Sequence, residues 1–509
     1  MGEPAVAGGA SVDGRDGRLT TAAVKGMAWR VASFGGNRVI VFVSTVLLAR
    51  LLAPRDFGVF AAALAFTQYL EVLLDLGTGS YIVYSQKGGG YDDDQVHVAF
   101  TYNLLMTAAL TTVTVVAAPY TSAAFGASGH AAVFAVMALY LALRGSMQMN
   151  RALMQRDLHF RKMIVFDLSG AVVRAAVSVV LALQGYGVWS IVAGLLIGQA
   201  VSSLAGWYLV RYRPRIRFDW GPGRSMMGFG LKSAAMNILT ELALNGDYLI
   251  VGSMMGATAL GVYTMAYRMP ELVINNLFWV FSEVAYPVYA KARVAGQEML
   301  RRAMLRALRL TTVYGFAAGV GLALVARDSV LVLFGANWRG AIPAMTILGL
   351  AAAVSTTGYA NGPLFPALGK PGSLLVVNVP LAVVRMSGFA IAARYGIVWV
   401  AVVHLVTNVA LSVVRLEMAN RFIGSSWSQT IGALKPGASA GIMVTLFALP
   451  ARLLMAPGPG ALVTIIALGV VGAVVGLAIA DRQTFGEIRG LLGTLAERSP
   501  SEAQPAPET

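Results

Sequence analysis

The sequence lacks the residue types on which many catalytic and metal centres depend. It contains no cysteine, which excludes disulfides, thiolate metal sites and cysteine nucleophiles. It contains only four histidines, and none forms the His-Glu-x-x-His pattern of a zinc protease. Charged residues make up only 12% of the 509 residues. We therefore expect no metal and no cofactor.

Apolar residues take the place of the missing charge. They make up 57% of the chain and fall into repeated blocks of about 20 residues, the length at which a helix spans the bilayer core. A helix also satisfies its own backbone hydrogen bonds in lipid. The sequence therefore predicts an all-α polytopic membrane protein with about 14 transmembrane helices. The predicted spans are 27–50, 57–77, 98–118, 131–150, 163–183, 187–210, 228–252, 257–284, 309–327, 341–362, 373–393, 397–418, 436–455 and 460–480.

Basic residues concentrate in alternate loops between these spans. The densest clusters are Arg151–Lys162, Arg211–Arg224 and Lys291–Arg309. Because cytoplasmic loops carry an excess of lysine and arginine, this pattern places both termini in the cytoplasm. The net charge of +15 then reflects loops that face anionic lipid, and we expect no nucleic-acid partner.

Short motifs recur in the same order in the two halves of the chain. The pairs are Leu52–Phe60 with Met255–Tyr263, Asn150–Leu153 with Asn361–Leu364, and Tyr186–Trp189 with Tyr395–Trp399. This spacing predicts two pseudo-symmetric six-helix lobes of the same orientation, followed by two extra C-terminal helices. The expected organisation is a disordered cytoplasmic tail (1–22), an N-lobe (23–212), a cytoplasmic linker (213–226), a C-lobe (227–421), the extra helices (422–482) and a second disordered cytoplasmic tail (483–509).

Polar residues inside the spans are the candidate functional groups. A charge at mid-membrane costs about 2.5 kcal/mol or more, so such a residue faces a water-filled cavity or a partner. On span 228–252, Ser233, Asn237, Glu241 and Asn245 recur every fourth residue and form one polar face. This face either lines a cavity or joins two helices by hydrogen bonds, and the ionisable glutamate favours the cavity.

Two further alternatives stay open on this evidence. Arg268 and Glu271 are spaced either for a structural ion pair or for a transport site. His404 is either a packing residue or part of a proton relay. Two lobes that meet around a polar face are the layout of an alternating-access transporter.

The N-terminal region resembles the Wzx-type oligosaccharide flippases of the multidrug/oligosaccharidyl-lipid/polysaccharide exporter superfamily. The similarity lies in Ala23–Trp29, in Leu47–Gly58 with the string LLARLLAPRDFG, and in Asp75–Gly77. The resemblance implies a V-shaped, two-lobed helical protein of the bacterial inner membrane with a central cationic cavity. It implies translocation of an undecaprenyl-pyrophosphate-linked oligosaccharide to the outer leaflet for cell-surface polysaccharide biosynthesis. The acidic residues within the spans depart from a purely cationic cavity.

The location of the polar residues within the spans, taken together with this resemblance, gives them their expected roles. Basic and amide groups would contact the pyrophosphate and sugars, and acidic groups would take up a coupling proton or sodium ion. The expected substrate-binding residues are Arg30, Asn37, Arg38, Arg174, Lys232, Asn237, Asn245, Arg268 and Arg385, and the expected ion-coupling residues are Glu241, Asp247 and Glu271.

The other expected partners are the bilayer and polysaccharide polymerases or glycosyltransferases. Alternative functions are a lipid II flippase or a cation-coupled drug exporter of the same superfamily. An integral-membrane glycosyltransferase or polymerase is disfavoured, because it would need a sizeable charged extracytoplasmic loop.

Overall fold

A computed structural model describes residues 36, 38–74, 94–156, 160–210, 212–482 and 484–486. The side chains at positions 160, 161, 222, 225–227, 229, 231–233, 235, 236, 243, 244, 279, 280 and 283 are outside this description. The described residues form helices joined by short turns, with no strand among them.

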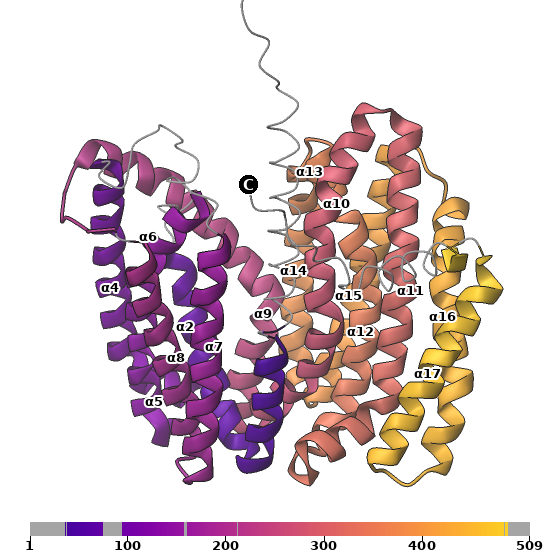
Figure 1. The fold of residues 1–509 in the computed structure, drawn as a ribbon, viewed down its shortest axis with the longest axis horizontal. Helices are drawn as coiled ribbons and strands as arrows, with labels where there is room; N and C mark the ends of the chain where they lie inside the picture. The colour runs from indigo at the N-terminus through magenta and orange to yellow at the C-terminus, as the bar shows by residue number, and fades with distance from the viewer. Residues whose placement is uncertain are drawn as a thin grey trace, which may run out of the picture. The chain divides into compact units, whose positions relative to one another are not determined.

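The helices lie along the chain as Figure 1 labels them. Residues 38–51 are helical. The helices that follow are α2 (Pro54–Leu74), α4 (Asp94–Ala124), α5 (Ala131–Val136), α6 (Ala138–Arg156), α7 (Phe160–Leu183), α8 (Val188–Leu209), α9 (Trp220–Pro270), α10 (Asn276–Val294), α11 (Gln297–Ser329), α12 (Ala341–Asn361), α13 (Leu364–Ala367), α14 (Gly372–Ala393), α15 (Ile397–Ile423), α16 (Trp427–Leu454) and α17 (Pro459–Ala480).

Twelve helices in the described part of the chain are long and apolar enough to cross a membrane. The expectation of an all-α polytopic membrane protein is therefore confirmed. The total of 14 spans stays a prediction, because the first predicted span, 27–50, lies partly outside the described residues.

The two spans predicted at 228–252 and 257–284 differ from the helices observed there. Helix α9 runs through both as far as Pro270, with one break in helical geometry at Gly256 (φ 81°, ψ 173°). Glycine adopts this positive φ without the clash that a side chain would cause. After Pro270, which has no backbone N–H to donate, the chain makes a wider π-helical turn over Glu271–Asn275 before α10 begins.

Two other helices begin earlier than their predicted spans. Helix α11 begins at Gln297, because Leu300, Met304 and Leu308 recur every fourth residue and bury one face of its basic first turns. Helix α16 begins at Trp427, where a capping box fixes the start: the Ser426 hydroxyl accepts from the Gln429 amide, and the Gln429 side chain accepts from the Ser426 amide.

The chain forms two compact units. The first comprises Met1–Leu52, Ala63–Ala123 and Ser128–Ile238; the second comprises Ala53–Ala62, Ala124–Ala127 and Leu239–Thr509. In the first unit α7 packs along α8, and α6 packs against α8. In the second unit α11 packs against α12 and α16, and α15 packs against α12 and α14. Helices α16 and α17 run side by side, as Figure 1 shows in yellow. The lobe boundaries expected from the sequence stay a prediction.

The first pair of repeated motifs forms a reciprocal close contact inside the second unit. A Cβ atom at Gly58 would overlap the carbonyl group of Ala257, and a Cβ atom at Gly261 would overlap the carbonyl oxygen of Pro54. Gly58 and Gly261 occupy the same place in the two motifs, as do Pro54 and Ala257. Such an exchange of equivalent partners is the pattern that a local twofold axis produces.

Candidate functional site

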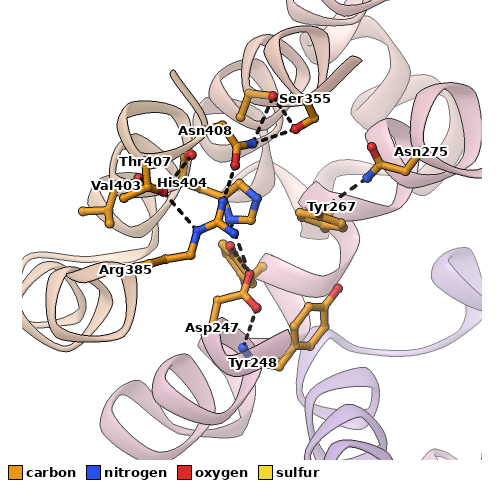
Figure 2. Close-up of polar contacts among 12 residues, drawn as sticks. Asp247, Tyr248, Tyr267, Asn275, Ser355, Arg385, Val403, His404, Thr407 and Asn408 are labelled. Carbon is orange, nitrogen blue, oxygen red and sulfur yellow. Dashed lines mark hydrogen bonds and ion pairs between the residues drawn. The ribbon is translucent and has the colours of Figure 1, made fainter. Parts of the chain in front are cut away.

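A cluster of charged and polar side chains lies among membrane-spanning helices of the second unit. Its centre is Asp247 of α9, whose residue is 1% exposed. The Tyr263 hydroxyl donates a hydrogen bond to Asp247 Oδ2 at 2.7 Å. The Nδ1 atom of His404, on α15, lies 3.9 Å from the same carboxylate oxygen. The main polar contacts of this cluster are drawn in Figure 2.

Arg385 of α14 supplies the positive charge of the cluster. Its Nε donates to the Thr407 hydroxyl at 3.0 Å, and its terminal nitrogen donates to the Asn408 side-chain oxygen. The guanidinium also interacts electrostatically with Asp247. Its neutral hydrogen-bond partners therefore hold the Arg385 charge near a carboxylate that is itself held by a tyrosine hydroxyl.

Asn408 links this charge to a further helix. Its amide nitrogen donates to the Ala351 carbonyl at 3.1 Å and to the Ser355 hydroxyl at 2.8 Å, both on α12. The network thus joins α9, α14, α15 and α12. Buried polar groups rigidify a core when all of them are hydrogen-bonded. A change in charge at Asp247 would therefore affect the packing of all four helices.

Aromatic rings enclose His404. Phe389 stacks on the imidazole with ring centroids 5.8 Å apart, and Tyr267 meets it edge-on at 5.7 Å. His404 Nδ1 is buried without a hydrogen-bond partner in the described part of the chain. The histidine ring therefore packs between aromatic side chains, and its Nδ1 atom faces the Asp247 carboxylate at a distance that is too long for a direct hydrogen bond but that a small cation could bridge. The described residues contain no group of three or more His, Cys, Asp or Glu side chains that could hold a metal ion.

The residues singled out from the sequence are only partly brought together here. Asp247 and Arg385 meet in this cluster. Arg268 and Glu271 form an ion pair at 3.3 Å near it, where Asn275 donates to the Tyr267 hydroxyl at 3.5 Å.

The polar face of α9 is only partly described. The Asn245 amide donates to Glu241 Oε1 at 2.7 Å, one helical turn away, and Asn237 is exposed. Arg38 and Arg174 are half-buried. Arg30, Asn37 and the side chain of Lys232 lie outside the described residues.

A second charged cluster, in the first unit, was not expected from the sequence. The Arg144 Nε and terminal nitrogen both lie 2.6 Å from Glu71 Oε1, and the Tyr140 hydroxyl donates to Glu71 Oε2 at 3.2 Å. Arg174 also interacts electrostatically with Tyr140. The available signal was Arg144 itself, an arginine inside the predicted span 131–150 and four residues after Tyr140.

Known proteins resemble this chain along most of its length. The succinoglycan biosynthesis transport protein ExoT of Rhizobium meliloti is 26% identical over 394 residues, which cover 76% of this chain and 79% of ExoT. The lipopolysaccharide biosynthesis protein WzxC of Escherichia coli is 25% identical, with 77% of this chain and 80% of WzxC covered.

The fold is also that of a solved transporter. The structure of the lipid II flippase MurJ in an inward closed conformation matches 90% of this chain and 99% of that chain, with a TM-score of 0.72 and 12% sequence identity. This low identity makes the likeness one of fold alone. A family model described as polysaccharide biosynthesis protein matches residues 47–343. These residues make up more than half of the chain, which therefore belongs to the polysaccharide biosynthesis protein family, in agreement with its resemblance to the Wzx-type flippases.

Proposed function

We propose that this protein translocates a lipid-linked oligosaccharide from the cytoplasmic to the outer leaflet of a bacterial inner membrane by alternating access. The observation that carries the proposal is the network of Asp247, Arg385, His404 and Asn408 inside membrane-spanning helices. Charged groups at such depth are costly, and they mark substrate paths, ion paths or proton relays in membrane proteins.

The chemistry of the cargo fits such a carrier. A sugar and pyrophosphate head cannot cross hydrocarbon unaided, whereas an undecaprenyl tail can stay in lipid. Guanidinium groups bind phosphate oxygens and acidic sugars through paired, charge-assisted hydrogen bonds. The names of ExoT and WzxC, which concern succinoglycan transport and lipopolysaccharide biosynthesis, support a glycan cargo. We assign head-group binding to the basic and amide residues proposed from the sequence: Arg30, Asn37, Arg38, Arg174, Lys232, Asn237, Asn245, Arg268 and Arg385.

Among the three acidic residues proposed for ion coupling, Asp247 has the surroundings that best suit the role. Glu271 is paired with Arg268, and Glu241 accepts the Asn245 amide. Asp247 is buried, whereas Glu241 and Glu271 are half-buried, and it accepts hydrogen bonds from the Tyr263 hydroxyl and the Tyr248 amide. A proton or sodium ion that joined Asp247 would weaken its attraction for Arg385 and so alter the contact between α9 and α14.

We propose that both termini face the cytoplasm, because the loops on that side then hold most of the arginines and lysines. The absence of native cysteine makes a direct test simple. Ser425→Cys, before α16, should be protected from an impermeant thiol reagent added outside right-side-out vesicles. Gly458→Cys, before α17, should react. The opposite pattern would overturn the orientation.

The function itself is tested by reconstitution. The purified protein in proteoliposomes should move a fluorescent undecaprenyl-pyrophosphate oligosaccharide to the outer leaflet, as measured by its accessibility to a lectin or to a membrane-impermeant quencher. Arg385→Gln should lower the rate at least tenfold. Arg394→Gln, an exposed arginine just after the same helix, is the matched control and should leave the rate unchanged.

Lipid II as the substrate in the same assay distinguishes the proposed function from its main alternative, a lipid II flippase. The lipid II reading rests on fold likeness alone, since the identity to MurJ is 12%. We expect the oligosaccharide carrier to be moved and lipid II not to be. Faster movement of lipid II would replace the proposed cargo, and movement of neither would reject both functions.

A further inference from the structure

A short basic and aromatic segment connects α8 to the first residue of α9. It runs from Tyr212 to Trp220 with the sequence YRPRIRFDW. Arg213, Arg215 and Arg217 alternate with other residues, and the chain between Tyr212 and Trp220 is not helical.

This segment is fixed to the beginning of α4 by hydrogen bonds. The Arg215 amide donates to His97 Nδ1 at 3.2 Å, and the Arg217 amide donates to the Thr101 hydroxyl at 2.9 Å. The Tyr102 hydroxyl donates to the Asp219 carbonyl at 3.4 Å. These contacts all lie within the first compact unit. These hydrogen bonds fix the backbone of the segment, so its side chains point in defined directions.

The apolar side chains of the segment are directed outward. Ile216 is 79% exposed, Phe218 62% and Trp220 61%. The Phe218 ring lies beside both Tyr102 and Trp220, with centroids 5.4 Å and 6.2 Å apart. Three large apolar residues beside arginines would be poorly solvated in water. They suit the boundary between head groups and acyl chains, where aromatic residues are enriched.

The position of the segment along the helices agrees with that boundary. It follows directly on α8, whose membrane span ends at Leu209, and it contacts the first two turns of α4, whose span begins at Asp94. Both span ends face the cytoplasm in the proposed orientation, the side on which anionic lipids attract basic segments.

Two of the three arginines are available to bind an anionic ligand. The Arg217 guanidinium pairs with Asp94. Arg213 and Arg215 are exposed, and no carboxylate in the described part of the chain pairs with them. Two unneutralised guanidinium groups beside an apolar ridge match a phosphate head group attached to acyl chains.

We propose that Arg213–Trp220 is a binding site for anionic phospholipid head groups. Arg213 and Arg215 bind the lipid phosphate, while Ile216, Phe218 and Trp220 sit among the upper acyl carbons. The site anchors the connection between α8 and α9 at the membrane surface. It does not depend on which molecule the protein transports.

Lipid retention tests the charged half of the site. The full-length protein in detergent micelles doped with equal phosphatidylglycerol and phosphatidylcholine is examined by native mass spectrometry. We expect the wild type to retain phosphatidylglycerol preferentially, and R213Q/R215Q to retain it about fivefold less for each arginine removed. R339Q/R394Q, which removes two exposed arginines elsewhere, should match the wild type. R213K/R215K should bind nearly as well as the wild type, which shows that a loss in the glutamine variant is one of charge and not of folding. Equal retention by R213Q/R215Q and the wild type would overturn the proposal.

A fluorescent label tests the apolar half of the site. Ile216→Cys carries an environment-sensitive nitrobenzoxadiazole group in nanodiscs that contain phosphatidylglycerol, and Ser425→Cys, in the turn before α16, serves as the control. We expect blue-shifted emission at position 216 and water-like emission at position 425. Water-like emission at both positions would reject seating in the membrane. It would indicate a surface for an acidic soluble partner instead.

Discussion

The two compact units each place an acidic residue and an arginine among membrane-spanning helices, but they connect them differently. In the first unit, two nitrogens of Arg144 lie 2.6 Å from one oxygen of Glu71, and Tyr140 binds the other oxygen. In the second unit, the carboxylate of Asp247 accepts from Tyr263, while Arg385 donates to Thr407 and Asn408.

This difference in hydrogen bonding distinguishes an ion pair that stabilises the fold from a pair of charges whose protonation or ion binding can change. A direct ion pair holds both charges in one arrangement, and removal of one partner strands the other. The Asp247 carboxylate accepts hydrogen bonds from neutral groups, so an amide at that position can keep the Tyr263 hydrogen bond after the charge is lost. We infer that the Glu71 cluster stabilises its unit, whereas the Asp247 cluster serves transport.

The largest effect expected is on transport in Asp247→Asn. The neutral amide can still accept the Tyr263 hydrogen bond, so the fold should persist, but the charge that attracts Arg385 is lost. We expect transport in proteoliposomes to fall at least tenfold, with little change in the unfolding temperature.

Glu417→Gln is the control for this substitution, because Glu417 forms an ion pair with Arg421 at 2.6 Å outside the Asp247 cluster. It should transport at the wild-type rate. Normal transport by Asp247→Asn would contradict the inference that the Asp247 cluster serves transport. A proton gradient and a sodium gradient, applied separately to wild-type vesicles, identify the coupling ion.

The next effect is on stability in Glu71→Gln. Loss of the carboxylate leaves Arg144 without its charged partner in a site where the two side chains are only 23% and 30% exposed. Breaking a buried ion pair costs about 3–5 kcal/mol, and partial exposure places this one near the lower end, at about 3 kcal/mol. Denaturant-induced unfolding in detergent measures the loss.

A second substitution checks that the loss comes from the stranded charge. The double variant Glu71→Gln/Arg144→Gln should recover part of the stability, because neither charge then lacks a partner. No recovery would mean that the cost comes from packing, and the two clusters would then differ less than their geometry suggests.

A third effect tests the local twofold relation between the two repeated motifs. Gly58→Ala should cost about 1–3 kcal/mol, because the added methyl group would overlap the Ala257 carbonyl. Gly261→Ala should cost a similar amount through its overlap with Pro54, and the double variant should cost less than the sum of the two.

The control glycine for this test is Gly432, inside α16, where an added Cβ meets no atom within 4 Å. Gly432→Ala should stabilise the protein by about 0.5–1 kcal/mol, because alanine favours the helix. Unequal costs at Gly58 and Gly261 would weaken the local twofold relation between the motifs.

The sequence predicted the helices better than the site. A run of apolar residues marks a membrane span by itself, and glycine explains the break at Gly256. The repeated motifs also pointed to residues that proved to be in reciprocal contact. Helix starts such as that of α11 were missed, because an amphipathic first turn carries charge and does not resemble a span.

The site was only partly predictable, because it depends on contacts between helices far apart in the sequence. Asp247 and Arg385 stood out as charges within apolar segments. Nothing local indicated that they would meet, or that Asn408 would bind Arg385 and Ser355. Arg144 was missed because its partner Glu71 lies two predicted spans earlier. The spacing of apolar residues and the composition of each span identify which residues are costly to place in lipid. The packing of the helices decides which of these residues form pairs.

The smallest effect concerns a feature that the two units share. Asn150 and Asn361 occupy equivalent places in the repeat, and both are 0% exposed. Neither side-chain amide has a hydrogen-bond partner among the described residues. An unpaired buried polar group costs about 1–3 kcal/mol, so a leucine of similar size should be tolerated or should stabilise the protein by about 1 kcal/mol. We expect Asn150→Leu and Asn361→Leu to shift denaturant unfolding equally in this direction. A loss of stability in both would show that each amide binds a buried water molecule. A loss in only one would mean that the halves differ here as they do in their charged clusters.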